Sequence, residues 1–321
     1  MKTLPLILCA MLFLFSDAAF AGNDEKAMQA YARGDYATAL TLAKPLAEHG
    51  DVKAQSLLAL MYDYGKGVPQ NAVQAIAWYR KAALQGDSHA QFEMGMCYET
   101  GRSTPIPKDF VQAAEWFRKA AVQRDAGSQY ELGMNYLLGE GLPKDDAQAA
   151  AWLRKAAIQG IAPAQYTLGV MYDGGMGVTQ DHAQADGWYR KAAMQESAEA
   201  QWALGGAYFK GDGVPRDFAQ AIVWFRKSAA HGNGDAQLNL GWMYANGIGV
   251  PQNLESGYAL YDLAKATSDP ISKMDRQDFQ KNTMMWQGVR SRMTPAQLVA
   301  SESLAMQMQR AGVLQALDAR K

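Results

Sequence analysis

The chain has 321 residues, of which 49% are hydrophobic and 20% are charged, and its formal net charge is −1. This composition is that of an ordinary folded protein with a substantial core. Nucleic-acid binding is not expected, because it requires a surplus of lysine and arginine on one face to neutralise phosphates.

The first 21 residues predict a cleavable secretory signal peptide. Lys2 precedes an apolar run over residues 4–15, and small residues lead to an expected cleavage site after Ala21. Twelve apolar residues are too few to span a bilayer comfortably. We therefore expect an exported, periplasmic protein, with an extracellular location as the alternative and with no membrane span in its mature chain.

Cys97 is the only cysteine outside this leader. A single cysteine excludes a disulfide framework, although an exported location would permit one. Because Cys97 directly precedes a tyrosine of the repeated pattern described below, we expect a packed thiol. A redox or intermolecular role is the alternative.

Residues 22–53 predict a degenerate helical hairpin. Tyr31, Leu40 and Leu46 fit two short helices on either side of a tight turn at Gly34. The pattern resembles a tetratricopeptide hairpin more than it resembles the units that follow. Since a terminal repeat must present one polar outer face, we expect this hairpin to be an N-terminal cap.

Residues 54–266 contain six copies of one pattern, spaced by 36 residues four times and by 38 residues once. The two extra residues lie between Gly101 and Asp109. Self-similarity at this period predicts a solenoid, in which each unit buries its apolar face against its neighbours. The copies begin at Ala54, Ala90, Ser128, Ala164, Ala200 and Ala236, and they share glutamine, tyrosine and tryptophan columns that begin at Gln55, Tyr62 and Trp78.

Each copy predicts two helices, as residues 200–232 illustrate. Gly205 lowers helix propensity by about 1 kcal/mol relative to alanine, so we expect it to permit close approach of a neighbouring helix. The first helix should end at Gly211, and Asp217 should cap the second. The second helix is expected to bury Ala221, Trp224, Phe225 and Ala229. The other copies place Asn71, Asp109, Asp145, Asp181 and Asn253 in the capping column.

The repeated residues resemble the Sel-one-like repeat (SLR), a relative of the tetratricopeptide repeat (TPR). The shared pattern is Ala-Gln-x-x-Leu-Gly-x-x-Tyr, then Gly-x-Gly-Val, then Asp-x-x-x-Ala-x-x-Trp-Tyr/Phe-Arg-Lys-Ala-Ala. The resemblance implies an all-α fold, a right-handed α-solenoid of six tandem 36-residue hairpins that holds partner proteins together, with no shared catalytic residues. Local departures from the pattern are Ala59, Ser103, Leu260 and Leu263.

Residues 267–321 predict C-terminal capping helices. An amphipathic stretch follows Pro270, and Thr294 with Pro295 supplies an N-cap and a first-turn proline for a helix through Arg310. Six of the 17 methionines lie in this segment. We expect them to pack onto the last repeat, and a methionine-rich binding groove is the alternative.

The sequence carries no motif of nucleophilic, metal-dependent or phosphate-binding catalysis. The Gly-x-Gly turns follow helices and not strands, so they do not indicate a nucleotide site. We expect a non-enzymatic protein with no cofactor and no metal, because the histidines lack metal-ligand spacing. The histidines are His49, His89, His182 and His231.

Arg-Lys pairs recur late in the second helices. A solvated stripe, with apolar stems lying over the helix, accounts for them, and an anionic partner is the alternative. The pairs are Arg80-Lys81, Arg118-Lys119, Arg154-Lys155, Arg190-Lys191 and Arg226-Lys227.

Candidate partner-binding residues lie where the copies differ. Offsets 2, 6 and 9 of the first helices lie opposite the repeated apolar face, yet they carry many aromatic and large apolar residues. We predict that they form a groove for an extended or helical segment of a partner protein. The alternative is that some rings wedge between adjacent repeats. The candidates are Phe92, Tyr130, Tyr166, Trp202, Phe209 and Trp242.

The sequence thus favours an exported, non-enzymatic scaffold or adaptor. By analogy with tetratricopeptide arrays it would bind another protein through the concave surface of its first helices, and a monomer is the default expectation. The alternative is a cell-wall enzyme or a β-lactam-binding or β-lactam-hydrolysing protein, because certain cysteine-rich bacterial proteins similar to this family are described as β-lactam-binding. This chain lacks their paired cysteines and the Ser-x-x-Lys nucleophile.

Overall fold

The structure, a computed structural model, describes residues 22–101, 106–267 and 276–319. Helices are the only regular secondary structure in these ranges, and tandem hairpins make the chain an all-α solenoid, as predicted. The contacts divide the chain into two compact units, Met1–Trp152 and Leu153–Lys321.

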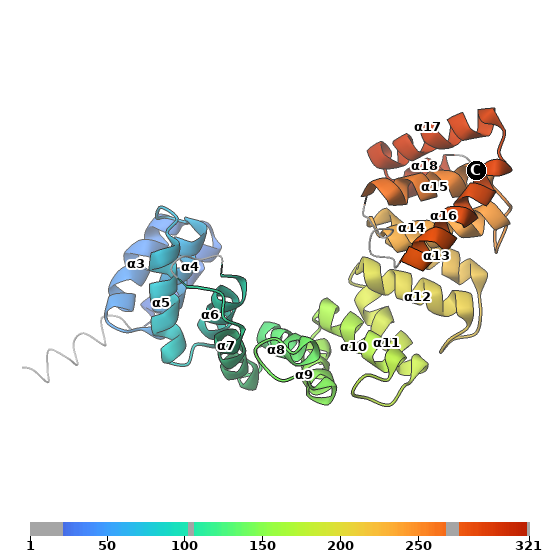
Figure 1. The fold of residues 1–321 in the computed structure, drawn as a ribbon. Helices are drawn as coiled ribbons and strands as arrows, with labels where there is room; N and C mark the ends of the chain where they lie inside the picture. Colours follow the sequence, from blue (N-terminus) through green and yellow to red (C-terminus); the bar gives the residue numbers. More distant parts are fainter. Residues whose placement is uncertain (1–21, 102–105, 268–275, 320–321) are drawn as a thin grey trace, which may run out of the picture. The chain divides into compact units, whose positions relative to one another are not determined.

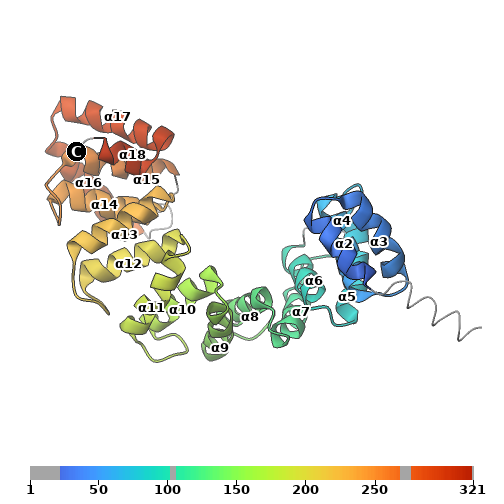
Figure 2. The same cartoon turned by 180° about the vertical axis from the view of Figure 1, so that it is seen from behind.

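The first unit is a series of antiparallel hairpins that follow one another along the chain (Figure 1). Its N-terminal hairpin, α2 and α3, lies beside α4 (Figure 2). The division between the units falls within α9 (Asp146–Ile158). The preceding helices are α2 (Asn23–Ala32), α3 (Tyr36–Glu48), α4 (Val52–Tyr64), α5 (Ala72–Leu84), α6 (Ser88–Thr100), α7 (Phe110–Val122) and α8 (Ala126–Leu138).

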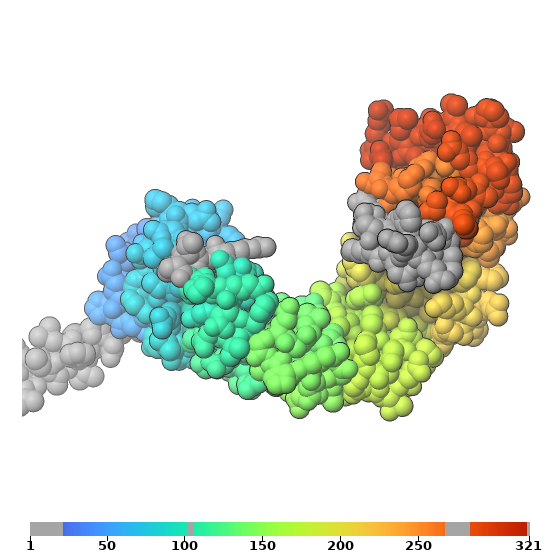
Figure 3. All heavy atoms as spheres, viewed as in Figure 1, coloured from blue at the N-terminus to red at the C-terminus, as the bar shows by residue number. Residues whose placement is uncertain are grey.

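The second unit continues the series and ends in three further helices. In the space-filling view its successive hairpins lie against one another, from light green to red (Figure 3). Its helices are α10 (Ala162–Gly174), α11 (His182–Ala193), α12 (Ala198–Lys210), α13 (Phe218–Ala230), α14 (Gly234–Asn246), α15 (Leu254–Thr267), α16 (Arg276–Ser291), α17 (Pro295–Ala311) and α18 (Val313–Asp318).

Polar side chains cap the N-termini of the second helices and of most first helices. The six predicted Asp and Asn caps of the second helices are confirmed, since each accepts a hydrogen bond from a backbone N–H in the first turn. The first helices begin two residues before the repeat register chosen from the sequence. Their caps are Asp51, Asp87, Asp125, Ser197 and Asn233, with Ile161 in the same column lacking a side-chain cap.

In three hairpins the glycine of the first helix admits an aromatic ring from the second helix of the same hairpin. A Cβ built on Gly205 would lie 2.5 Å from Cδ1 of Phe225. Gly95 and Phe117, and Gly169 and Tyr189, repeat the arrangement. Because no real Cβ tolerates such a distance, the predicted close approach is confirmed, and the glycine permits the hairpin to close.

The tryptophan column is less buried than the sequence suggested. Ala221, Phe225 and Ala229 are buried as expected, but Trp224 is half-exposed. The residue after each tryptophan carries the ring or side chain that fills the hairpin core. These core residues are Tyr79, Phe117, Leu153, Tyr189, Phe225 and Tyr261.

The basic pairs have structural partners, so they are more than a solvated stripe. Four of the five lysines cover the face of the tryptophan three residues earlier, as Lys191 Nζ does at 3.9 Å from the centre of the Trp188 ring. Four of the five arginines donate to the tyrosine hydroxyl of the following repeat. The arginine pairs are Arg118 with Tyr136, Arg154 with Tyr172, Arg190 with Tyr208, and Arg226 with Tyr244.

The glutamine column links consecutive repeats through buried hydrogen bonds. Gln165 Nε2 donates to the Ala157 carbonyl of the preceding helix, at 3.0 Å. Its Oε1 accepts from Gln195 at the end of the following helix, at 2.8 Å. The same carbonyl contact is made by Gln55, Gln91, Gln129, Gln201 and Gln237.

The C-terminal helices complete the core of the last repeat. Leu260 and Leu263, which replace the tryptophan and lysine of the pattern, are buried in one cluster with Leu304 and Met308 of α17. A tryptophan with a lysine over its outer face fits a helix surface that is exposed to solvent, whereas two leucines fit a surface that another helix covers. Trp286 of α16 is also buried, and its ring stacks on that of Tyr261.

Some expectations concern residues outside the described ranges. The signal peptide, cleavage at Ala21, most of the two-residue insertion and the segment at Pro270 all lie there, so they stay predictions. Cys97 is described: it is partly buried against the core cluster of α5 and α6.

Candidate functional site

The second unit contains a cavity of about 560 Å³, centred on α12 and called the α12 cavity below. The first helices of three consecutive repeats contribute to its lining, together with the second helices between them. Residues that form it include Tyr166 and Asp173 of α10, Asp186 and Tyr189 of α11, Trp202, Gly206 and Phe209 of α12, Phe225 of α13 and Trp242 of α14.

Four of the six predicted partner-binding residues line this cavity: Tyr166, Trp202, Phe209 and Trp242. They come from offsets 2, 6 and 9 of their copies, and three first helices bring them around one space. The volume lies within the range of small-molecule and side-chain binding pockets. The aromatic positions of these three repeats therefore converge on one concave feature.

Two of these rings also contact their own hairpins. The Tyr166 ring lies 5.8 Å from that of Tyr189, and the Phe209 ring lies 5.5 Å from that of Phe218, measured between centroids. Burial raises the pKa of the Tyr166 hydroxyl. These rings thus serve packing on one side and line the cavity on the other, so the wedge and groove interpretations are not exclusive for them.

Phe92 and Tyr130 belong to the first unit and do not line the α12 cavity. Phe92 packs against Phe117 and against Gly127 of the next repeat, which matches the wedge interpretation. Tyr130 is half-buried, and burial raises the pKa of its hydroxyl. The adjacent Glu131 carboxyl has its pKa raised to about 7 by burial and by the charge of Glu99.

Carboxylates give the α12 cavity a polar side. Asp186 is only 5% exposed, and its Oδ2 accepts no hydrogen bond. Burial raises its pKa to about 6; the charges of Asp173 and Asp212 add to the shift, while Arg190 and His182 oppose it. The indole Nε1 of Trp202 is likewise buried without an acceptor. Asp186 therefore adds a carboxylate to a lining that is rich in aromatic rings.

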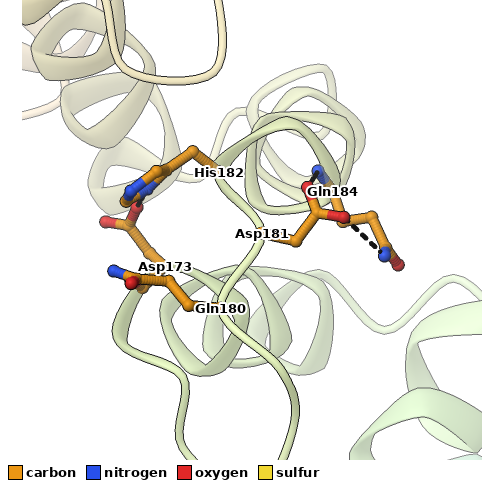
Figure 4. A network of polar contacts seen from close by, with 5 residues as sticks. All are labelled: Asp173, Gln180, Asp181, His182 and Gln184. Atoms are coloured by element: carbon orange, nitrogen blue, oxygen red, sulfur yellow. Dashed lines mark hydrogen bonds and ion pairs between the residues drawn. The ribbon is translucent and has the colours of Figure 1, made fainter.

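At the edge of the cavity, Asp173 pairs with His182 (Figure 4). Nδ1 of His182 lies 2.5 Å from Oδ1 of Asp173, and this hydrogen bond raises the pKa of the imidazole. The nearby Asp181 is turned the other way and caps α11 through Gln184, so it serves the fold and not the cavity. His182, which showed no metal-ligand spacing, thus orients a carboxylate at the cavity edge.

Asp186 and Tyr189 were missed by the sequence analysis. Tyr189 belongs to the repeated core column and gives no distinguishing signal. Asp186 does give one, since it is an acidic residue in a column that is otherwise apolar. That column contains Ile76, Ala114, Ala150, Ile222 and Tyr258.

Two kinds of feature are absent from the residues that the structure describes. In these ranges no helix combines the length and apolarity needed to cross a bilayer. Within the same ranges, no group of His, Cys, Asp and Glu is arranged to hold a metal ion.

The comparison with protein families matches six Sel1 repeats, over residues 52–87, 88–123, 126–161, 162–197, 198–233 and 234–266. The chain belongs to the Sel1 repeat family. Sel1 repeat proteins generally serve as scaffolds for protein interactions. The matched repeats begin with the observed first helices, two residues before the register chosen from the sequence.

A solved structure that is 36% identical supports the Sel1 assignment. A Sel1 repeat protein from Oxalobacter formigenes is 36% identical, with a TM-score of 0.68 over 76% of this chain and 97% of that one. A protective antigen of uropathogenic Escherichia coli with an SLR fold is 25% identical, with a TM-score of 0.49 over 94% and 86%. No curated protein matched the chain.

Proposed function

We propose that this Sel1 repeat protein is an exported, non-enzymatic scaffold that binds a segment of a partner protein in the α12 cavity. The observation that carries the proposal is the convergence of Tyr166, Trp202 and Trp242 on that cavity from three successive first helices. These positions vary among the repeats, so maintenance of the repeat fold does not require aromatic residues there.

Aromatic side chains suit such a role because each buries a large area at low entropic cost. Residues of this kind dominate the binding energy of many interfaces when they surround a pocket. Half-exposed Trp202 and Trp242 thus supply apolar surface that a partner side chain can cover.

Gly206 provides a way to test the cavity without removing any packed side chain. A Cβ built there meets nothing within 4 Å, and the same column carries Met96 and Met134 in earlier repeats. Gly206→Met should therefore fill the cavity while preserving the fold. Trp202→Ala removes a cavity wall, and Trp224→Ala removes a ring that does not line it.

The experiment is selection of a displayed library of random twelve-residue peptides against the full mature chain. We expect peptides that bind the wild type and the Trp224→Ala variant, and that lose at least tenfold in affinity for the Gly206→Met and Trp202→Ala variants. Failure to select any peptide, or binding that is indifferent to Gly206→Met, would contradict the proposal.

Export rests on the leader pattern of residues 1–21. Helix α2 begins at Asn23, so cleavage after Ala21 would leave it whole. N-terminal sequencing of the protein recovered from a native cell envelope should begin at Gly22. Recovery of the intact leader from the cytoplasm would contradict export.

A further inference from the structure

Asp186 is the feature of the α12 cavity that the repeat fold does not explain. Its column is apolar and buried in the other five copies, and at 5% exposure Asp186 is as buried as they are. A buried carboxylate without a hydrogen-bond partner is unfavourable, so native proteins rarely retain one without a ligand or function. Asp186 Oδ2 is such a group.

The chain packs tightly around this carboxylate. A Cβ on Gly213, in the loop after α12, would lie 2.6 Å from Asp186 Oδ2. Gly213 has a φ of +73°, so its glycine is needed both for the turn and for this approach. The loop covers one side of Asp186, and the α12 cavity lies on another.

The basic side chains near Asp186 bind other partners. Arg190 Nη2 donates to the Tyr208 hydroxyl of the next repeat, at 3.3 Å. His182 is paired with Asp173. Among the described residues that line the cavity, Lys210 is exposed and is the only basic one, against the three carboxylates of Asp173, Asp186 and Asp212. The acidic lining of the cavity is thus matched to a cation from outside.

The walls of the cavity fit the rest of a basic side chain. Aromatic faces attract lysine and arginine cations, and they also cover the aliphatic stem. Trp202 and Trp242 provide such faces.

We propose that the α12 cavity binds a lysine or arginine side chain of the partner segment, with its cation on Asp186 and its stem between Trp202 and Trp242. This inference rests on the docking function proposed above and names what is docked. An acidic segment is excluded by the three carboxylates.

The first helices of the first unit also carry acidic residues. Glu93, Glu99 and Glu131 are half-buried, and burial raises the pKa of each carboxyl. A basic partner segment would be complementary to this face as well, although the proposal depends only on the α12 cavity.

The test uses the same displayed peptide library at pH 7.5, selected in parallel on the wild type, on Asp186→Asn and on Asp262→Asn. Asp262 is a matched control, because burial also raises its carboxyl pKa but it pairs with Lys265 and does not line the cavity. We expect one position to be enriched in lysine or arginine in the wild-type and Asp262→Asn pools, and the enrichment to be lost in the Asp186→Asn pool.

A synthetic peptide from the wild-type pool then measures the contribution of the charge. Replacing its enriched basic residue by norleucine should weaken binding to the wild type at least tenfold and leave binding to Asp186→Asn unchanged within twofold. Peptides that bind in a Gly206→Met-sensitive manner without a basic preference would overturn this inference and leave the docking function standing. A selection that yields no cavity-dependent peptide would overturn both.

Discussion

At the scale of single residues, Gly205 shows how one position can be fixed by packing. Its propensity cost in a helix was visible in the sequence, and this predicted a close contact. The sequence did not show which side chain contacts the glycine. Two adjacent positions of the second helix were candidates: the conserved tryptophan and the more variable residue that follows it. The observed neighbour is Phe225, and Trp224 lies outside the core.

Replacement of Gly205 by alanine should destabilise the protein although alanine favours helix. The new methyl group would lie 2.5 Å from the Phe225 ring and force repacking, at a cost of about 1–3 kcal/mol. Gly206→Ala on the same helix meets no neighbour and should be neutral or stabilising by up to about 1 kcal/mol. Urea unfolding of the two variants measures the difference, and equal stabilities would refute the ring contact.

Asp186 should make the stability of the fold depend on pH. Its carboxyl pKa rises from 3.8 to about 6 on folding, so the folded chain holds this proton more tightly than the unfolded chain. The associated stability is present below about pH 4 and is lost as the pH rises through about 6, by roughly 3 kcal/mol.

Asp186→Asn removes this titration and keeps the shape of the side chain. We expect the variant to be more stable than the wild type at pH 7.5, by up to roughly 3 kcal/mol, with the advantage vanishing at pH 4. Comparing the two proteins in urea at both pH values cancels the other titrating groups. An advantage of the same size at both pH values would show that Asp186 is not the source.

At the scale of elements, the hairpins were predictable in detail and their connections were not. Turn glycines and Asp or Asn caps are local signals, so the ends of the second helices followed from the sequence. The glutamine column was visible as a repeated letter, but its role requires two neighbouring hairpins in space. Gln201 donates to Ala193 in one repeat and lies 3.0 Å from His231 Nδ1 in its own.

Gln201→Leu should weaken the coupling between the fourth and fifth repeats. It removes two hydrogen bonds of a side chain that is 2% exposed, which we expect to cost about 1–3 kcal/mol. The exposed Gln220→Leu on α13 should change stability by less than about 0.5 kcal/mol. Chemical unfolding, read by circular dichroism, checks both variants, and a Gln201→Leu protein as stable as its control would contradict a coupling role.

At the scale of the whole molecule, stability is a sum over repeats and the contacts between neighbours. Periodicity therefore predicted the solenoid well. It could not predict the α12 cavity, because a cavity arises where three copies depart from the pattern together. Four of the six aromatic candidates line it, whereas Phe92 packs within its own unit, since a ring at an expected surface position can also fill a gap between helices.

The sixth repeat also departs from the pattern for a reason that only the structure shows. Leu260 and Leu263 were departures without an explanation in the sequence, and the structure explains them by the covering α17. A departure from a repeat pattern thus marks either a covered surface, as here, or a functional position, as we propose for Asp186. Burial against the rest of the chain distinguishes the two.

The central claim, that the α12 cavity is where a partner segment docks, is tested most directly by photo-crosslinking. A peptide selected on the wild type, carrying a benzophenone next to its enriched basic residue, would be irradiated with the protein and the attachment sites mapped by mass spectrometry. The account predicts attachment to residues of α10, α12 and α14 around Tyr166, Trp202 and Trp242, abolished by Gly206→Met. Attachment to Trp188 or Trp224 on the second helices, or attachment that survives Gly206→Met, would contradict it.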